Sequence, residues 1–539
     1  MENPLATALD AFRTAVGPDN VVTEPSQLAR YETATFAVGR RVPAVVKPGS
    51  REQVQECMRL ATAHRIPVYP ISTGRNIGYG SRVPTADGCI VLELSRMRRL
   101  EVNVEHAYAR LEPGVTQSQL FDYLRDNRIP LWMDATGAPK DHSILGNTVE
   151  RGFGHTPYGD HFGNVGAMEV VLATGEAFRT GFGHYPSAKA HGVYRWGVGP
   201  YVDGLFTQSN LGVVTEITLW LMPTPAYVQK FFFGVDRHDE LALLIDLLRP
   251  LRLDGTLRSA IHVVNDYKSL NAVQLYPWER TQGETPLQPE LLRQFAAPLG
   301  FNAWNASGAL YGTRNEVKVA RRKIKRLLRG KVKQLRFLDE QALALAERLQ
   351  RPLSLLLRKD LSKLIGVLHP VFGLTRGVPT DHFLASTYWR KRDARHALSD
   401  PDPDRDRCGQ LWIAPIAPLS GEHAETIYRI ASEIMLAHGF EPMVSITLLT
   451  PRAMDCVLGI AYDRDVPGED QRALDCHAAL LERFAEAGYY PYRLSLASMG
   501  RLPPPQPGYA AFRQALKQAL DPAGILAPGR YEEADSGLC

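Results

Sequence analysis

Residues 71–80, ISTGRNIGYG, decide the fold of this 539-residue chain. An apolar run with Ile66, Val68 and Ile71 leads into them, which predicts the loop at the end of a β-strand. Its glycines allow successive backbone N–H groups to point into one concavity that can hold a phosphate or pyrophosphate, and Arg75 adds a fixed positive charge beside it. The stretch lacks the Lys-Ser/Thr ending of a P-loop and the spacing of a dinucleotide fingerprint. An ordinary glycine-rich turn is the alternative interpretation.

The residues on either side of this loop predict alternating strands and helices. A strand and a turn lead into a helix with Ser50 as its N-cap, and Gln53 is expected to complete a capping box. Residues 100–115 alternate as a β-hairpin. Two further glycine-rich segments, 144–161 and 205–223, each adjoin a strand-like run. The first part of the chain is therefore predicted to be α+β.

Length and composition indicate a globular protein with two domains. Apolar residues make up 45% and charged residues 22%, and the net charge of +4 is too small to imply a polyanionic partner. The six cysteines form neither a CxxC pair nor a metal-ligand pattern. The N-terminus lacks a signal peptide, and no apolar run approaches the roughly 20 residues of a membrane span. We expect a cytoplasmic location, no membrane association and no bound metal.

The basic stretch 318–336 is the one segment that suggests nucleic-acid binding. No aromatic residues interleave with its charges, as a stacking platform for bases requires. A solvated helix with one packed face is the better interpretation, because apolar residues recur at helical spacing. These residues are Val317, Ala320, Ile324, Leu327 and Leu328.

Strings spread over almost the whole chain carry a strong resemblance to a known family. They are GRNIGYG (74–80), LEPGVT (111–116), GNTVERG (146–152), TPYGDH (156–161), DGLFTQSNLGVVTEI (203–217), GVPT (377–380) and DPAGILAPGR (521–530). In this order they resemble the FAD-linked oxidases of the vanillyl-alcohol oxidase and p-cresol methylhydroxylase type. The resemblance implies a two-domain α+β fold and a homodimer. Residues 1–225 would form a discontinuous FAD-binding domain, 226–494 an α+β cap domain over the flavin, and 495–539 a segment returning to the first domain.

The resemblance also places the FAD against the glycine-rich segments. The residues that it assigns to the cofactor are Ser72, Thr73, Gly74, Arg75, Asn76, Ile77, Gly78, Gly137, Gly146, Asn147, Glu150, Gly212, Val214, Gln410 and Arg530.

Three residues match the positions at which the family binds a phenol: Tyr79, Tyr492 and Arg493. Two hydroxyl groups and a guanidinium would converge on the phenolic oxygen. Lowering a phenol pKa from about 10 to about 7 requires roughly 4 kcal/mol of preferential stabilisation of the anion, which a buried arginine and two hydrogen-bond donors can supply. Without the resemblance, a Tyr-Arg pair would be read as a surface feature.

Further positions are carried over as the lining of the substrate pocket, with simple core packing as the alternative for each. They are Phe153, His155, Trp412, Ser445, Thr447 and Val457. Ser445 stands where the hydroxylase branch of the family has an acidic residue. A small hydroxyl group leaves room there but is no strong base.

The position that carries the flavin covalently in many family members is Gln410 here, and an amide cannot form that bond. The hydroxylase branch uses a tyrosine slightly earlier in the chain, but Tyr388 lies too far back to align with it. His396 and Cys408 are nearer nucleophiles that match no family position. The FAD is therefore expected to be bound without a covalent link, although a link through an unaligned residue such as Tyr388 or His396 stays open.

A second departure concerns the base near the flavin. The family places an aspartate there a few residues after the match to Asp134, and this position falls on or beside Gly137. Asp141 and His142 are close, but the segment is one residue longer than in the family. His142 is a candidate for the missing base, and a purely structural role of this side chain is the alternative.

The resulting hypothesis is flavin-dependent oxidation of a para-substituted phenol at a benzylic or allylic carbon, such as a 4-alkylphenol or a compound like vanillyl alcohol. O2 or a cytochrome would accept the electrons. A flavin dehydrogenase of a non-phenolic alcohol and a degenerate flavoprotein without turnover are the two rivals. Neither rival requires a phenolate site, so the presence of Tyr79, Tyr492 and Arg493 argues against both.

Overall fold

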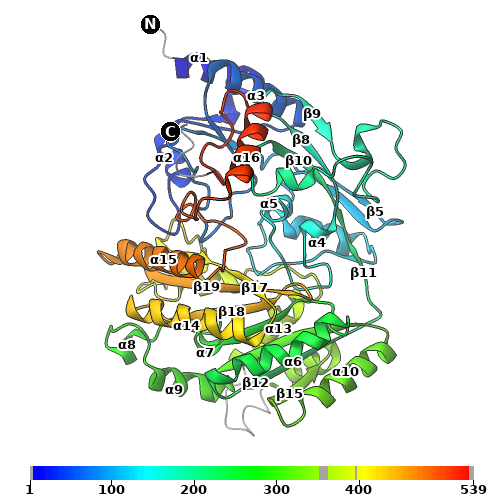
Figure 1. The fold of residues 1–539 in the computed structure, drawn as a ribbon, viewed down its shortest axis with the longest axis vertical. Coiled ribbons are helices and arrows are strands. Elements are labelled where there is room, and N and C mark those ends of the chain that lie inside the picture. The colour runs from blue at the N-terminus through cyan, green and yellow to red at the C-terminus, as the bar shows by residue number, and fades with distance from the viewer. Residues whose placement is uncertain (1–3, 351–361, 395–396, 533–539) are drawn as a thin grey trace.

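The computed structural model describes residues 4–350, 362–394 and 397–532. The chain forms two lobes (Figure 1). The chain up to about residue 225 and the last helix, drawn in blue to green-cyan and in red, make one lobe, and the middle of the chain makes the other. The two-domain α+β architecture predicted from the sequence is confirmed. We propose domain boundaries near residues 225 and 494, because in the described part of the chain no strand pairing joins the sheets on either side of residue 225.

The first lobe begins with a small sheet that positions the loop 72–78. Its strand order is β1 (Val21–Val22), β2 (Val45–Val46), β4 (Ile90–Glu93) and β3 (Val68–Ile71), and the last three are parallel. Helix α3 (Arg51–His64) crosses between β2 and β3 and packs on α1 (Pro4–Val16). Ser50 caps α3 by accepting from the Gln53 N–H at 3.3 Å. The expected capping box is wrong in one detail, because the Gln53 side chain accepts from Gly49 rather than from Ser50.

A second, antiparallel sheet completes this lobe. Its order is β5 (Leu100–Asn103), β6 (Tyr108–Leu111), β10 (Val213–Trp220), β8 (Val165–Val171) and β9 (Ala177–Arg179), so the hairpin predicted over 100–115 is confirmed. Helices α2 (Pro25–Leu28), α4 (Gln117–Asp126) and α5 (Ile144–Val149) belong to the same lobe, and β7 (Leu131–Trp132) pairs with β11 (Met222–Pro223).

The cap lobe contains an eight-stranded sheet. Its order is β15 (Lys333–Leu338), β12 (Tyr227–Val235), β14 (Trp304–Gly312), β13 (Ile261–Asn265), β18 (Met443–Leu448), β19 (Ala453–Asp463) and β16 (Cys408–Ile413), with β17 (Ile416–Pro418) also on β19. Four helices pack together with the apolar side of this sheet: α6 (Leu241–Leu253), α10 (Arg314–Leu328), α14 (Gly421–Ala437) and α15 (Glu469–Glu486). The other helices of this lobe are α7 (Asp266–Asn271), α8 (Trp278–Thr281), α9 (Pro289–Leu299), α11 (Glu340–Arg348) and α13 (Ser362–Leu374).

The end of the chain returns to the first lobe. Helix α16 (Pro507–Leu520) lies beside it in Figure 1. The Lys517 ammonium donates to the carbonyl oxygens of Asn210 at 3.0 Å and Leu526 at 2.8 Å. The Ala527 N–H donates to the Val68 carbonyl at 2.8 Å, which adds a residue pair beside β3. The FAD-binding domain is therefore discontinuous, as expected.

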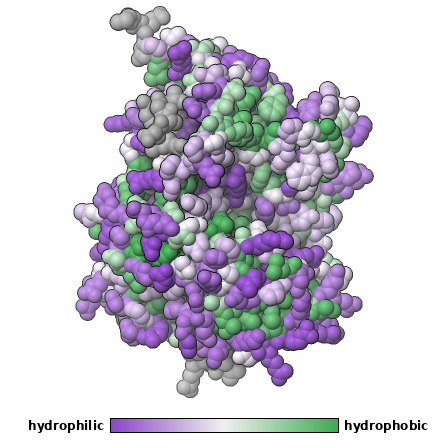
Figure 2. All heavy atoms as spheres, viewed as in Figure 1, coloured by the Kyte–Doolittle hydropathy of each residue, from purple (hydrophilic) through white to green (hydrophobic). Residues whose placement is uncertain are grey.

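The surface is mixed in polarity. Figure 2 shows hydrophilic residues spread over both lobes of one face, with hydrophobic residues in scattered patches between them. The basic stretch forms α10 and the start of β15, and Val317, Ile324 and Leu328 are buried on the packed side of α10. Within the part of the chain that the structure describes, no helix is both long and apolar enough to cross a membrane.

Candidate active site

The loop 72–78 offers a row of unpaired donors. The backbone N–H groups from Thr73 to Ile77 donate to no acceptor among the described residues, and the buried Thr73 hydroxyl has no partner there either. Gly74 and Gly78 have φ angles of 71° and 78°, a conformation that glycine adopts without steric cost. Consecutive free N–H groups in such a turn form a concavity that binds anions. The loop therefore fits the pyrophosphate of a dinucleotide.

Other elements approach this loop so closely that two glycines have no space for a side chain. A Cβ atom at Gly78 would lie 2.1 Å from Cδ1 of Trp412, and one at Gly146 would lie 2.4 Å from the Ser72 Oγ. Hydrogen bonds also hold these elements together, since the backbone N–H of Trp412 donates to the Gly78 carbonyl at 3.2 Å. The Gly78 N–H donates to the Thr35 hydroxyl at 3.1 Å. The cap strand β16 and helix α5 thus meet at the loop expected to hold FAD.

The remaining glycines assigned to the cofactor differ in their surroundings. A Cβ atom at Gly212 would overlap Val170, and Val214 is buried on the neighbouring part of β10. At Gly137 the nearest atom to a Cβ would be 3.8 Å away, on Phe383, so there is room beside this residue. Contacts of these three positions with FAD stay predictions.

Glu150 connects the C-terminal segment to the pocket. Its carboxylate accepts hydrogen bonds from Arg530 and, at 2.8 Å, from the Tyr531 hydroxyl. The Arg493 Nε lies 3.4 Å from the same carboxylate. Two guanidinium groups therefore share one carboxylate, and the group carries one positive charge in excess.

The structure brings together the three residues predicted to bind a phenol. The Arg493 guanidinium lies over the Tyr79 ring, 4.4 Å from its centroid, and its Nη2 donates to the Asn76 Oδ1. The Tyr492 ring lies 5.8 Å from that of Phe153, a predicted pocket residue. Arg493 is only 8% exposed, so its charge acts in a largely desolvated environment.

Both tyrosine hydroxyl groups remain protonated. Burial raises the pKa of Tyr79 well above 10, the neighbouring Tyr492 raises it further, and the Arg493 charge opposes this effect. Burial and Asp455 likewise raise the pKa of Tyr492, again opposed by Arg493. At neutral pH these groups can therefore donate hydrogen bonds to an anion, and a positive charge stands beside them.

Asp455 is a pocket residue that the sequence did not point out. It is fully buried on β19, and neither carboxylate oxygen has a hydrogen-bond partner among the described residues. Burial raises its pKa well above the usual value near 4, so the protonated form is favoured. Asp455 lies opposite Thr447 in the register of β18 and β19. In the sequence, Asp455 is recognisable only as an acidic residue within an apolar strand.

The predicted pocket residues of the cap share one face of the sheet. Val444, Ile446 and Leu448 pack into the core beneath the helices, so Ser445 and Thr447, which alternate with them, point to the opposite face. The register pairs Ser445 with Val457 and Trp412 with Gly459, which puts these side chains on that same face.

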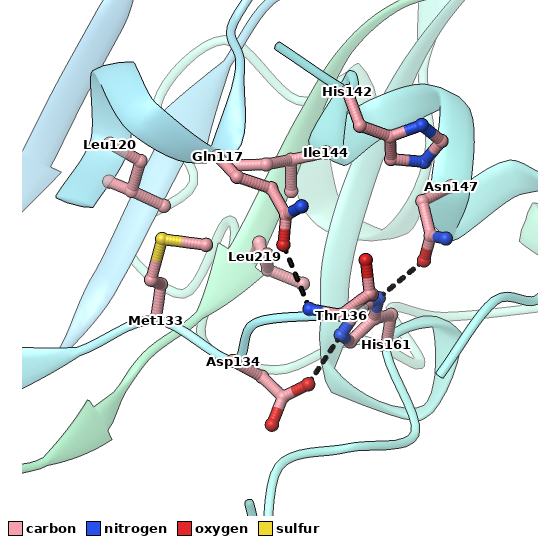
Figure 3. A pocket seen from close by; sticks show the side chains of 10 residues that line it. All are labelled: Gln117, Leu120, Met133, Asp134, Thr136, His142, Ile144, Asn147, His161 and Leu219. Carbon is pink, nitrogen blue, oxygen red and sulfur yellow. Dashed lines mark hydrogen bonds and ion pairs between the residues drawn. The ribbon is translucent and has the colours of Figure 1, made fainter. Parts of the chain in front are cut away.

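A loop of the first lobe supplies Phe153 and His155. Asp134 holds this loop by accepting from the N–H groups of His155 at 3.2 Å and Thr156 at 2.6 Å. Figure 3 shows the other Asp134 oxygen bonded to His161, which also contacts Asn147. Both Asp134 oxygens are engaged, so this carboxylate anchors the pocket loop rather than acting as a base.

His142 presents a free ring nitrogen near this anchor. Its Nδ1 lies 3.2 Å from the Arg75 carbonyl, which assigns the proton to Nδ1, and its buried Nε2 has no partner among the described residues. Burial and the Arg493 charge lower the His142 pKa to about 4. The neutral ring is thus a hydrogen-bond acceptor but a weak base. Asp141 instead forms an ion pair with Arg75 at 2.6 Å.

Gln410 is buried at the position expected for a covalent flavin link. Its side-chain amide donates to the Leu411 carbonyl at 3.3 Å. Tyr388 is fully buried, and its hydroxyl donates to Asp406 at 2.5 Å. Burial raises the pKa of the Cys408 thiol, which disfavours the thiolate. His396 lies outside the described residues.

The charged, proline-punctuated loop 398–409 has a sequence typical of a mobile segment, and its mobility stays a prediction. Asp404 is buried and accepts from the Ser81 hydroxyl at 2.7 Å, while Arg82 lies 3.6 Å away. Asp402 is 3.7 Å from Arg75. These contacts hold the loop against the end of the glycine-rich segment.

Among the described residues, no three His, Cys, Asp or Glu side chains are placed to hold a metal ion.

Comparisons with known proteins agree with this geometry. Residues 42–181 match the model of an FAD binding domain. The chain is 43% identical over 531 residues to 1'-carboxy-chondrochloren decarboxylase from Chondromyces crocatus, covering 98% of this chain and 97% of that protein. It is 31% identical to the flavoprotein subunit of hydroxylating 4-cresol dehydrogenase from Pseudomonas putida, covering 97% and 94%.

A solved structure is also similar. The 4-ethylphenol oxidase of Gulosibacter chungangensis, in complex with isoeugenol, superimposes with a TM-score of 0.88 at 30% identity, over 99% of this chain and 98% of that one. The matched domain binds FAD, and the loop 72–78 has a geometry that fits the pyrophosphate of this cofactor. The chain therefore belongs to the vanillyl-alcohol oxidase and p-cresol methylhydroxylase family of FAD-dependent oxidoreductases.

Proposed function

We propose that this enzyme oxidises the benzylic or allylic carbon of a para-substituted phenol. Arg493 and Arg530 share the single carboxylate of Glu150, which leaves one positive charge in excess beside two protonated tyrosine hydroxyl groups. This observation carries the proposal. A neutral alcohol would leave this charge uncompensated, whereas a phenolate would neutralise it.

The residues act on the phenolic oxygen. Tyr79 and Tyr492 donate hydrogen bonds to it and Arg493 stabilises its negative charge, so the bound phenol ionises more readily than in water. The phenolate raises electron density at the para carbon, which facilitates the loss of hydride from its substituent. FAD supplies the hydride acceptor when bound. A p-quinone methide remains, and the neutral His142 and protonated Asp455 provide no strong base to add water to it.

A second candidate is oxidative decarboxylation, which the 43% identity to a decarboxylase favours. The first step is the same. If the carbon next to the benzylic carbon bears a carboxylate, the bond from that carbon to the carboxylate breaks and CO2 leaves. Its electron pair forms a new C=C bond, and the ring returns to the phenolate. A 4-vinylphenol derivative would be the product.

The test is anaerobic mixing of the FAD-loaded protein with 4-ethylphenol, vanillyl alcohol and benzyl alcohol while the oxidised flavin absorbance is followed. We expect the two phenols to bleach the flavin and benzyl alcohol to leave it unchanged. Bleaching by benzyl alcohol at a similar rate would support a dehydrogenase of non-phenolic alcohols. Retention of the flavin colour with every compound would support a flavoprotein without turnover.

The family resemblance also supports O2 or a cytochrome as the electron acceptor and a homodimeric state. The cytoplasmic location is proposed from the widely spaced cysteines, which fit a reducing compartment.

A further inference from the structure

Lys230 is a buried cation without a counter-ion. It lies on β12, is 1% exposed, and its ammonium donates to the Val371 carbonyl at 3.1 Å. No acidic side chain forms an ion pair with it among the described residues. Burial of an unpaired ammonium is costly, and it lowers the Lys230 pKa to about 7. The Phe232 ring, whose centroid lies 5.6 Å from the ammonium, compensates part of the charge, but no anion among the described residues does.

Lys230 points to the pocket face of the cap sheet. Phe231 and Phe233 alternate with it and pack into the core under the helices. The register pairs Lys230 with Ala309 on β14, and His262 of β13 with Ser307, so Lys230 and His262 emerge on one face. The lysine charge lowers the pKa of His262 and contributes to the lowered pKa of His155, which places the three groups near one another.

The two histidines form a polar cluster with Thr447. Their rings lie 4.4 Å apart, and the His262 Nδ1 is 3.1 Å from the Thr447 hydroxyl. Among the described residues, the buried His262 Nε2 has no hydrogen-bond partner, and the nearby Lys230 ammonium has no counter-ion. A negatively charged hydrogen-bond acceptor at this end of the pocket would satisfy both groups.

The cluster belongs to the same pocket as the phenol-binding residues. Phe153, two residues before His155, lies beside Tyr492. Thr447 lies opposite Asp455, which is close enough to Tyr79 and Tyr492 for its ionised form to affect their pKa values. Positive charge thus lies at two ends of the pocket: Arg493 at one, and Lys230, beside two neutral histidines, at the other.

We infer that Lys230, His155 and His262 form a subsite that binds a carboxylate on the para side chain of the substrate. This inference rests on the proposed function, because it places a phenol ring between the two positive ends. The carboxylate accepts charge-assisted hydrogen bonds from the Lys230 ammonium and an imidazole N–H. The preferred substrates are then 4-hydroxyphenyl alkanoates rather than neutral alkylphenols.

The test compares 3-(4-hydroxyphenyl)propanoate with the neutral 4-propylphenol in the FAD-loaded enzyme. The wild type should bind the acid at least about tenfold more tightly, as judged from flavin reduction at varied concentration. Lys230→Met should abolish this preference while 4-propylphenol is bound and oxidised within about threefold of the wild type. Lys230→Arg should restore part of the preference. A loss of one charge-assisted hydrogen bond corresponds to about tenfold or more in affinity.

Lys268→Met is the matched control. Lys268 also lacks an acidic partner among the described residues, and it lies over the Trp412 ring at 5.0 Å. Loss of the acid preference in this variant but not in Lys230→Met would overturn the assignment, as would equal affinities for both compounds in the wild type. Oxidation of 4-propylphenol reports on folding and on the proposed function. Failure of both compounds to bleach the wild-type flavin would instead contradict the phenol oxidation itself.

Discussion

The guanidinium carbon of Arg493 lies 4.4 Å from the centre of the Tyr79 ring. Tyr79 belongs to the loop of the FAD-binding domain, whereas Arg493 comes at the end of the cap domain. This cation–π contact holds the guanidinium over the ring. The edge of the guanidinium reaches Asn76 and approaches Glu150, so the position of the charge depends on both domains.

Arg493→Ala should reduce the rate of flavin reduction by a phenol at least about a hundredfold, because the charge that favours the phenolate is lost. The FAD content, measured from the absorbance of the purified protein, should change little. Arg530→Ala provides the contrast, since Arg530 lies in the segment assigned to the cofactor and should lose FAD. An Arg493→Ala protein that loses flavin but regains full turnover with excess FAD would show that Arg493 serves the cofactor.

A bound phenol should ionise at neutral pH, well below its solution pKa of about 10. Isoeugenol should therefore show the red-shifted absorbance of a phenolate when bound. Its O-methyl ether has no proton to lose and leaves Arg493 without a counter-charge, which should weaken binding at least about a hundredfold. Equal affinities without a spectral shift would contradict the phenolate site and favour an enzyme for non-phenolic alcohols.

The FAD should be released by acid precipitation, because Gln410 cannot form a covalent link and the Tyr388 hydroxyl is buried and bonded to Asp406. The yellow colour is expected in the supernatant. Flavin fluorescence that stays with the protein band on a denaturing gel would disprove the non-covalent assignment. The variant Gln410→His then tests whether residue 410 alone determines covalent attachment of the flavin.

Gly78→Ala should abolish FAD binding. Its φ angle is 78°, and a Cβ atom would lie 2.1 Å from Trp412, so the loop and the cap strand cannot both keep their positions. Gly88→Ala is the matched control, with a φ angle of 72° and no atom within 4 Å of a Cβ. It should cost only about 1 kcal/mol of stability and retain FAD. Equal FAD content in the two variants would contradict the close approach of Trp412.

Asp455→Asn should stabilise the protein, and more so at pH 7.5 than at pH 4.5. The unfolded carboxyl group ionises above about pH 4, whereas burial keeps the folded one protonated. Folding therefore takes up a proton, and Asp455 contributes an increasing destabilisation as the pH rises above 4. We expect a gain of roughly 1–3 kcal/mol in the free energy of unfolding at pH 7.5, measured by urea titration.

The matched control for this prediction is Asp521→Asn. Asp521 is equally buried but is paired with the Lys517 ammonium at 2.8 Å, so its amide variant should be destabilised at pH 7.5. An Asp455→Asn effect of the same size at both pH values would contradict a raised pKa.

Local patterns predicted much of the fold, because the loop 72–78, the α3 cap Ser50 and the hairpin 100–115 are determined by neighbouring residues. The roles of Lys230, His262 and Asp455 could not be predicted in this way. A polar residue in an alternating strand normally indicates a solvent face. Here that face is covered by the other domain, and only the register of the eight-stranded sheet reveals which side chains meet there. The attachment of loop 398–409 likewise depends on contacts with distant residues.

The return of the last segment to the first lobe has a consequence for synthesis of the protein. Glu150 and its partner Arg530 are 380 residues apart. At about 5–20 residues per second, roughly 20–80 s separate their appearance from the ribosome. The first domain must wait in an unfinished state for that time, and a chain terminated early would lack Arg530 and remain colourless. Uptake of the yellow cofactor thus reports that translation has passed residue 530.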